Sequence, residues 1–237
     1  MSIDLNDFTP LSAVFELRYA PQFLIWDRSG ALWTRIASIF PAIAVKQAEP
    51  NQVLVRLEHN VDAAVGAERT IFTVRKPNSG FDRLKAVAGA VVPAMIDLFE
   101  IDQFTRVGLR LVFGKRFPDR YAAADYLKAR VPVPQPPGRI MNVDGRLLDP
   151  QISYRWESDT TGFVLRLRAD QHTLNFELPV EYQHLMPAAQ DLILNQAVVD
   201  IDYYVHSQVS ADQLRAEDLI ENWLRLIKRD IGKVLHG

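Results

Sequence analysis

The 237-residue sequence contains no cysteine, which excludes disulfide bonds, thiolate catalysis and cysteine-ligated zinc. The absence is compatible with a reducing compartment. Five histidines stand at positions 59, 172, 184, 206 and 236, and none of them forms an HxxH or HExxH pair. The nucleophile-elbow, P-loop and dinucleotide-binding motifs are absent too. The sequence therefore predicts no metal site and no cofactor, and it names no reaction.

Net charge is also small, because 29 acidic residues nearly balance 27 basic ones and leave a formal charge of −2. A net charge of this size does not attract the chain to nucleic acid or to an anionic membrane. Long hydrophobic runs are missing as well: residues 86–96 form the longest one, and Gly89 and Pro93 interrupt it. The first ten residues are acidic and end in Pro10, unlike a signal peptide. We therefore expect a cytoplasmic protein without membrane contact.

Hydrophobic periodicity in the first half predicts two helices among four strands. The stretch SAVFELRYA, residues 12–20, alternates apolar and charged residues, which is typical of a half-buried strand. A helix capped by Ser29 and closed by Pro41 follows it. The remaining elements are strands at 52–59, 69–76 and 104–117 and a helix at 81–98. This order predicts a ferredoxin-like βαββαβ unit in residues 1–118, with both helices on one face of an antiparallel sheet.

Residues 119–237 show a different order of elements. A short helix at 121–129 leads into VPVPQPPG, residues 131–138, whose four prolines predict a stiff extended connector. The meander that follows has strands at 151–158, 162–170 and 172–179, a short helix at 187–195 and a last strand at 197–207. SADQ at 210–213 is a capping box that predicts a long C-terminal helix. The predicted fold class is α+β: a ferredoxin-like half followed by an antiparallel-sheet half that a long helix closes.

Three motifs carry a resemblance to a known family. PLSAVFELRY at 10–19, RVGLRLVF at 106–113 and VVDIDYY at 198–204 resemble the motifs of a sporadically distributed family of uncharacterised bacterial proteins of about this length. In that family Pro-Leu opens the first strand, a Gly-Leu-Arg strand lies in mid-chain, and an Asp-x-Asp strand precedes the C-terminal helix. The family places Tyr or Phe followed by Asn soon after Gly-Leu-Arg, where this chain has LVFG at 111–114. The resemblance implies the architecture and no activity.

The charges on the predicted strands are the most informative feature for function. In the first half they lie opposite the large apolar residues: Glu16, Arg18, Arg56, Glu58, Arg106 and Arg110. Because the first and last strands of a ferredoxin-like sheet are neighbours, we expect Arg18 near Arg110, where two guanidinium groups would suit a carboxylate or a phosphate. Gly108, on the same face, would leave room for a ligand or for an abutting chain. Glu16 and Glu58 are expected to balance the arginines.

In the second half Arg166 and Arg168, and likewise Asp200 and Asp202, share polar strand faces. The two aspartates would suit Mg²⁺ together with Glu177, but the surrounding arginines favour ion pairs. The ordinary interpretation of all these charges is a solvated sheet whose residues pair across strands. A polar cleft between the halves and an anion site remain the alternatives. The candidate ligand-binding residues are Arg18, Arg106, Arg110, Asp200 and Asp202.

Two functions remain open, and the sequence favours the first. It is a non-enzymatic binding or regulatory module that uses the charged face or the cleft, with a small anion, another protein or a second copy of the chain as its partner. The second is an enzyme acting on a small phosphate or carboxylate substrate, which needs Arg18 and Arg110 to converge with Asp200, Asp202 or His206. RNA binding is disfavoured, because residues 69–76 lack the aromatic motif of the RNA-recognition fold. Trp26, between the first strand and the first helix, is the tryptophan expected at the surface.

Overall fold

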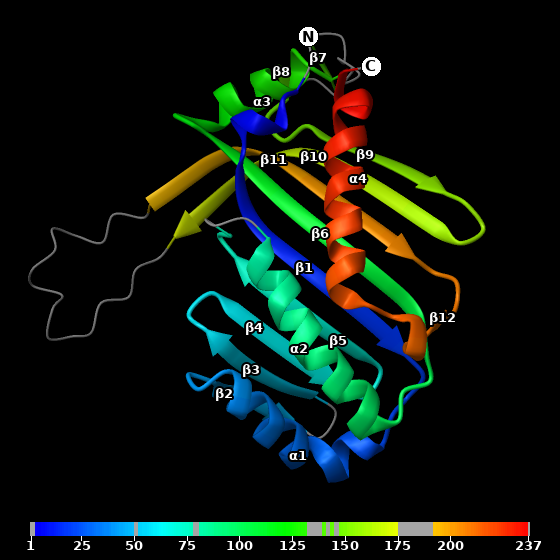
Figure 1. The fold of residues 1–237 in the computed structure, drawn as a ribbon. Coiled ribbons are helices and arrows are strands. Elements are labelled where there is room, and N and C mark those ends of the chain that lie inside the picture. Colours follow the sequence, from blue (N-terminus) through cyan, green and yellow to red (C-terminus); the bar gives the residue numbers. More distant parts are fainter. Residues whose placement is uncertain are drawn as a thin grey trace, which may run out of the picture.

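The computed structural model describes residues 3–49, 52–77, 81–131, 139–140, 143–144, 147–174 and 192–236. One large antiparallel sheet dominates this part of the chain, in the strand order β2-β3-β4-β5-β1-β6-β11-β10-β9 (Figure 1). Its strands are β1 (Thr9–Tyr19), β2 (Ala44–Glu49), β3 (Gln52–Glu58), β4 (Val61–Gly66), β5 (Arg69–Arg75), β6 (Gln103–Phe117), β9 (Gln151–Glu157), β10 (Thr161–Leu174) and β11 (Leu192–Val205). A short strand, β12 (Val209–Ser210), pairs with the start of β6, and β7 (Arg139–Ile140) pairs with β8 (Val143–Asp144) in a separate small sheet.

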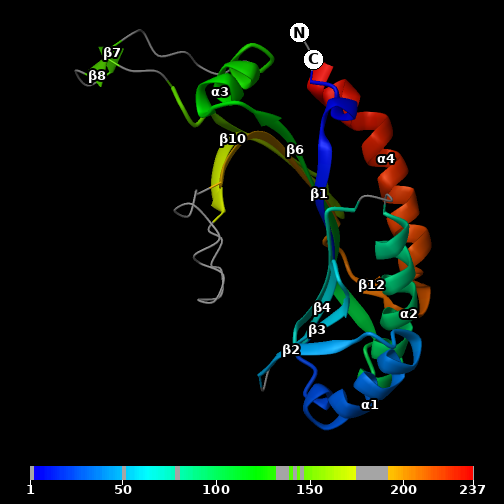
Figure 2. The same ribbon diagram turned by 90° about the vertical axis from the view of Figure 1, so that its left-hand side faces the viewer.

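The α-helices in the described part of the chain lie on one side of the large sheet, which curls away from them (Figure 2). Aromatic contacts attach three of them: Phe113 of β6 meets Phe81 at the start of α2, with ring centroids 6.5 Å apart. Phe117 meets Tyr126 of α3 at 5.1 Å, and Tyr203 of β11 meets Trp223 of α4 at 5.2 Å. The helices are α1 (Leu24–Ile39), α2 (Asp82–Phe99), α3 (Arg120–Lys128) and α4 (Ala216–His236).

The hydrophobic core fills the space between the sheet and these helices. Every second residue of β1 from Ala13 to Leu17 is buried, and so is every second residue of β6 from Val107 to Leu111. The apolar stripe of α2, which includes Val91 and Met95 at helical spacing, packs on β1 and β5. The buried residues of the strands and the apolar stripe of the helix therefore pack in one hydrophobic core. The predicted α+β class, with a large antiparallel sheet and a C-terminal helix, is confirmed.

Between α1 and α2 the chain forms four strands where the sequence analysis predicted two. The additional strands are β2 and β4. All six residues of β2 are exposed, so no apolar alternation marks it. The sequence of β4, VDAAVG, contains weak strand formers, yet five of its six residues are buried between β3 and β5. Tertiary pairing, and not local propensity, makes these residues strands.

In the second half, long-range pairing overturns three local predictions. The turn predicted near residue 171 is wrong, because β10 continues unbroken to Leu174 and pairs with β11 along its whole length. The helix predicted at 187–195 is wrong over residues 192–195, which begin β11; residues 187–191 lie outside the described residues. The predicted capping box is wrong too, since Ser210 ends β12 without a capping hydrogen bond from its side chain and α4 begins at Ala216.

The two predicted halves of the chain share one sheet. Strand β6 of the first half pairs with β11 of the second, from Val107 opposite Val205 to Phe117 opposite Asn195. Helix α3 begins where expected, and the side chain of Asp119 accepts a hydrogen bond from the backbone N–H of Ala122 at 2.8 Å. Apart from Val131, the proline-rich connector at 131–138 lies outside the described residues.

Candidate functional site

The side of the sheet opposite the helices is strongly polar, and we call it the polar face. Side chains of a strand alternate between the two sides, so the pairing register assigns each one to a face. The basic side chains of the polar face are Arg18, Lys46, Arg56, Arg69, Arg75, Arg106, Arg110, Arg116, Arg155, Arg166 and Arg168, and its acidic ones are Glu16, Glu49, Asp62, Glu157, Asp170, Asp200 and Asp202. Basic groups therefore exceed acidic groups here, on a chain whose net charge is −2. All five candidate residues lie on this face.

Asp200, in the middle of β11, is the centre of the densest charge cluster. Its carboxylate has no exposed surface and accepts two hydrogen bonds from Arg110, from Nε at 2.8 Å and from Nη2 at 2.7 Å. Arg168 and Arg166 approach the same carboxylate from β10, with Nη1 at 3.5 Å and 3.7 Å from Oδ2. One buried carboxylate thus faces three guanidinium groups. Hydrogen bonding to Asp200 raises the pKa of Arg110 and outweighs the opposing effect of burial.

Asp202 holds a second arginine, two residues further along β11. Both of its oxygens accept hydrogen bonds from Nη2 of Arg106, at 3.2 Å and 3.1 Å. The Arg106 guanidinium also stacks on the ring of Tyr204, 4.1 Å from its centroid. The expectation that Asp200 and Asp202 are ion-pair partners is confirmed. The space beside Gly108 is occupied by the side chain of Arg106, since a Cβ atom at Gly108 would lie 3.4 Å from Nη2 of Arg106.

The expectation that Arg18 lies near Arg110 is wrong, although β1 and β6 are neighbours. The register places Arg18 opposite Arg106, and it places Arg110 opposite Val14. Arg18 lies four positions after Val14, which corresponds to about 13 Å along a strand. Arg18 forms an ion pair with Glu16 on its own strand. Arg18 therefore does not join the Asp200 cluster.

Glu58 was expected to balance the arginines of this face, but it pairs instead with Arg83 of α2. A bulge between Arg56 and Glu58 shifts the register of β3 against β4 at this point. The side chain of Glu58 therefore leaves the polar face. A bulge of this kind has no reliable mark in a single sequence, so alternation alone assigned the wrong side.

A third cluster, around Asp62 of β4, was missed by the sequence analysis. The Asp62 carboxylate is almost fully buried and lies 2.6 Å from Nη2 of Arg75, 3.2 Å from Nε of Arg56 and 3.4 Å from Nζ of Lys46. Burial raises its pKa, but the hydrogen bonds from these three cations outweigh burial, so the pKa lies below its ordinary value. The one available signal was an aspartate within the apolar run VDAAV. On each side of β1, the polar face thus has one buried aspartate surrounded by three basic side chains.

At the β9 edge of the polar face, Tyr204 connects the Asp202 pair to a further charged group. Its hydroxyl donates a hydrogen bond to Oε1 of Glu157 at 3.3 Å, and Arg155 contacts the same oxygen at 2.8 Å. Hydrogen bonding from Arg155 lowers the pKa of Glu157. His206 lies at the end of β11, where Nε2 is 3.1 Å from the carbonyl oxygen of Ser158 and 3.9 Å from Glu157. This histidine is separate from the Asp200 cluster.

The comparisons with known proteins leave the function to be inferred from this geometry. No family model matches the chain, and a search of curated proteins finds no match. Within the described ranges, no three histidine or acidic side chains come together as metal ligands would. None of the helices in those ranges has the length and the apolar character that crossing a membrane requires.

Proposed function

We propose that the protein is a non-enzymatic binding module whose polar face binds an anionic ligand, a phosphate or a carboxylate, at the Asp200 cluster. The observation that carries this proposal is the excess of donors: three arginines share the buried carboxylate of Asp200, and of the three only Arg168 has a second carboxylate partner in the described chain, Asp170, with Oδ2 3.3 Å from its Nε. Arg110 donates hydrogen bonds to both oxygens of Asp200, whereas Arg166 makes no hydrogen bond within the described part of the chain. A bound anion would accept the remaining N–H donors of Arg166 and Arg168.

The enzymatic alternative has less support. Catalysis by Asp200 or Asp202 as a base requires a carboxylate oxygen within hydrogen-bond reach of a substrate, and arginines already engage both oxygens of each. The convergence that such an enzyme needs also involves Arg18, which pairs with Glu16 beside Arg106. Binding without turnover therefore fits the arrangement better.

A thermal-shift screen tests this proposal. Inorganic phosphate, citrate and a panel of phosphorylated and carboxylated metabolites would be added at constant ionic strength. We expect at least one anion to raise the Tm of the wild type, and Arg166→Gln to weaken its apparent Kd by about tenfold. Arg225→Gln is the matched control, since Arg225 is an exposed residue of α4 whose guanidinium donates a hydrogen bond to Oδ1 of Asn222.

The screen has two outcomes that contradict the proposal. Equal stabilisation of the wild type and of Arg166→Gln by every anion would show that the Asp200 cluster is not the binding site. Chemical conversion of a stabilising anion, detected by phosphorus or carbon NMR and lost in Arg166→Gln, would favour the enzyme instead. A stabilising anion that is recovered unchanged supports a binding module.

We also propose that residues 1–118 are an enlarged ferredoxin-like unit, followed by a second structural half in residues 119–237. Two features support this. Strand β1 lies between β5 and β6, which α2 connects, as in a split βαβ unit. The four strands β2 to β5 take the place of the usual two. We likewise propose that the chain belongs to the bacterial family that the three motifs resemble, because that resemblance implies the same architecture.

A further inference from the structure

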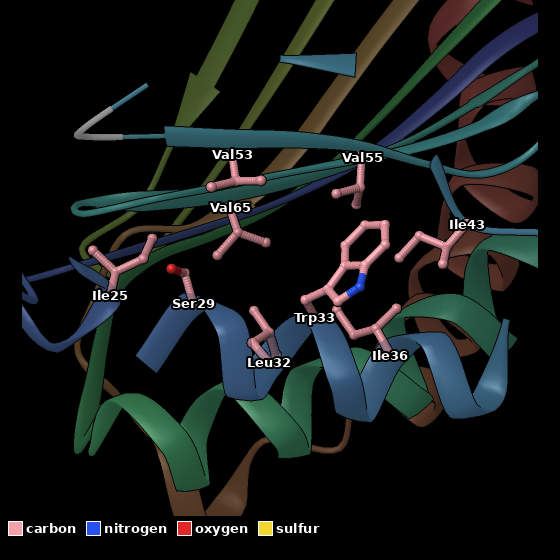
Figure 3. A pocket seen from close by; sticks show the side chains of 9 residues that line it. All are labelled: Ile25, Ser29, Leu32, Trp33, Ile36, Ile43, Val53, Val55 and Val65. Carbon is pink, nitrogen blue, oxygen red and sulfur yellow. The ribbon is translucent and has the colours of Figure 1, made fainter. Parts of the chain in front are cut away.

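The two ends of the large sheet are built differently. At the β2 end, helix α1 packs on the sheet, and Figure 3 shows Trp33 and Ile36 of this helix facing Val55 of β3. At the other end β9 is the last strand, and in the described part of the chain its one pairing partner is β10 (Figure 1). Trp156 of β9 is 46% exposed, although its ring contacts Phe163 on the side of the sheet that carries the core.

The two edge strands also differ in how they resist pairing with another chain. Strand β2 has a bulge between Val45 and Gln47, with an exposed lysine, Lys46, at the bulge. Bulges and lysines are devices that keep a sheet edge from pairing with a further strand. Strand β9 pairs with β10 without any shift of register, and residues 151–157 contain neither proline nor lysine. Its outer edge is therefore regular and suited to a further strand.

The outer edge of β9 presents the backbone groups of its odd-numbered residues. In an antiparallel pair every second residue exchanges two hydrogen bonds with the partner strand, and the residues between them point their N–H and C=O groups away. Beyond one end of β9, the N–H of Ser158 donates to the carbonyl of Thr161 at 2.8 Å. Beyond the other end, the N–H of Ala169 donates to the carbonyl of Pro150 at 3.1 Å. Even-numbered residues thus bond to β10, and the outward groups belong to Gln151, Ser153, Arg155 and Glu157.

We propose that β9 is a dimerisation edge, which pairs antiparallel with β9 of a second copy of the chain about a two-fold axis perpendicular to the sheet. The hydrogen bonds of such a pair must join outward residues of both copies. Only the register centred on Tyr154 joins all four. It places Ser153 opposite Arg155 of the second copy, and residue 151 opposite residue 157. Centring the pair on Arg155 would place this arginine opposite its own copy, which like charges disfavour.

The same register covers the aromatic side chains on the core side of β9. The ring of Trp156 contacts Tyr154 at 5.7 Å and Phe163 at 5.4 Å, so the three rings form a row at the edge. In the dimer Tyr154 would lie opposite its own copy, and Ile152 opposite Trp156 of the second copy. Aromatic pairs and pairs of an aromatic with a β-branched residue stabilise neighbouring strands. Backbone, charge and apolar contacts therefore favour one and the same register.

The dimer goes beyond the anion-binding function proposed above, because its interface uses no residue of the Asp200 cluster. A two-fold axis perpendicular to the sheet keeps the helices of both copies on one side. The two polar faces would then join into one surface that carries two Asp200 clusters. Pairing of one short strand forms a small interface, so we expect the dimer to dissociate on dilution.

Sedimentation velocity over chain concentrations from about 1 µM to about 1 mM tests the dimer. We expect the wild type to change from monomer to dimer across this range. Arg155→Pro removes an outward N–H that β10 does not use, so it should weaken dimerisation by about tenfold or more. Arg155→Ala is the matched control, since it loses the same ion pair with Glu157 but keeps the N–H. This control should dimerise like the wild type.

Single cysteines test the register, because the chain has no cysteine of its own. In the pair centred on Tyr154, the two Cα atoms of this residue would lie about 4.5 Å apart, within the range of a disulfide. Tyr154→Cys, oxidised with copper phenanthroline, should therefore give a disulfide-linked dimer on a non-reducing gel. Residue 155 would lie diagonal to its own copy at about 7–8 Å, so Arg155→Cys should link far more slowly.

Three results would overturn the proposal. They are a monomer at every concentration, a dimer that Arg155→Pro leaves unchanged, and linking of Arg155→Cys as fast as that of Tyr154→Cys. Circular dichroism melts establish that each variant is folded. Arg155→Pro should keep the stabilisation by anions, and Arg166→Gln should keep the dimer. Failure of the dimer and failure of the anion site are therefore distinguished.

Discussion

The substitution Asp200→Asn tests how the sheet accommodates three arginines around one buried group. It preserves the shape of the side chain and removes its negative charge. In the wild type the carboxylate accepts two hydrogen bonds from Arg110 and lies within 3.7 Å of Arg166 and 3.5 Å of Arg168. In the variant, three guanidinium groups would face a neutral amide with a single acceptor oxygen. Their mutual repulsion would then be opposed by the neighbouring carboxylates alone, Asp170 beside Arg168 and Asp202 near Arg110.

The expected loss of stability follows from the exposure of the partners. Removing one member of a fully buried ion pair costs about 3–5 kcal/mol. The side chains of Arg110, Arg166 and Arg168 are 48%, 34% and 30% exposed, so water screens part of the repulsion. We therefore expect Asp200→Asn to lower the free energy of unfolding by about 2 kcal/mol. Asp202→Asn should lower it by only about 1 kcal/mol, since Asp202 is partly exposed and has a single arginine partner.

Urea denaturation at low and at high ionic strength measures both losses. For Asp200→Asn the loss should shrink as salt rises, because salt screens the repulsion among the freed arginines. Phosphate should stabilise this variant more than it stabilises the wild type, since an anion can take the position of the lost carboxylate. A loss below about 0.5 kcal/mol, which is the scatter of ordinary surface substitutions, would refute the reasoning. So would a loss equal to that of Asp202→Asn.

Two further predictions concern the buried Tyr19 and the close contact at Gly162. Burial raises the pKa of Tyr19 to about 12, above the ordinary value of 10.0, so the neutral phenol is favoured in the folded state and stability falls as the pH rises from about 10 towards 12. Tyr19→Phe should remove this loss of stability at alkaline pH, which reaches about 3 kcal/mol. At neutral pH the substitution should cost about 1–2 kcal/mol, because the hydrogen bonds to Gly66 and Thr70 are lost. Urea midpoints across the pH range measure both effects, and an unchanged slope of stability at alkaline pH would contradict the raised pKa of Tyr19. Gly162→Ala should lower the free energy of unfolding by about 1–3 kcal/mol, because the new Cβ would lie 2.2 Å from the ring of Tyr204. Gly108→Ala, the control, should change stability very little. Equal melting temperatures for the two variants would show that Tyr204 moves aside freely.

Local patterns sufficed for those parts of the fold in which a strand alternates strongly. In β1, the buried Ala13, Phe15 and Leu17 alternate with less buried residues, of which Glu16 and Arg18 are charged, and a similar pattern occurs in β6. Both strands were therefore predicted, with the correct faces and as neighbours. Strand β4 and the first residues of β11 were not predicted, because pairing with distant strands stabilises them and their own sequences give no periodic signal.

In the candidate site, too, some features follow from local sequence patterns and others from long-range pairing. The sequence by itself determined that Arg106 and Arg110 share one face of their strand and that Asp200 and Asp202 share one face of theirs, because side chains alternate along every strand. Only the tertiary structure decided which charges meet. Arg110 is directly opposite Asp202, yet its guanidinium reaches diagonally to Asp200, where it meets the arginines of β10. Register between distant strands and the reach of long side chains set these pairs, and neither is a local property of the sequence.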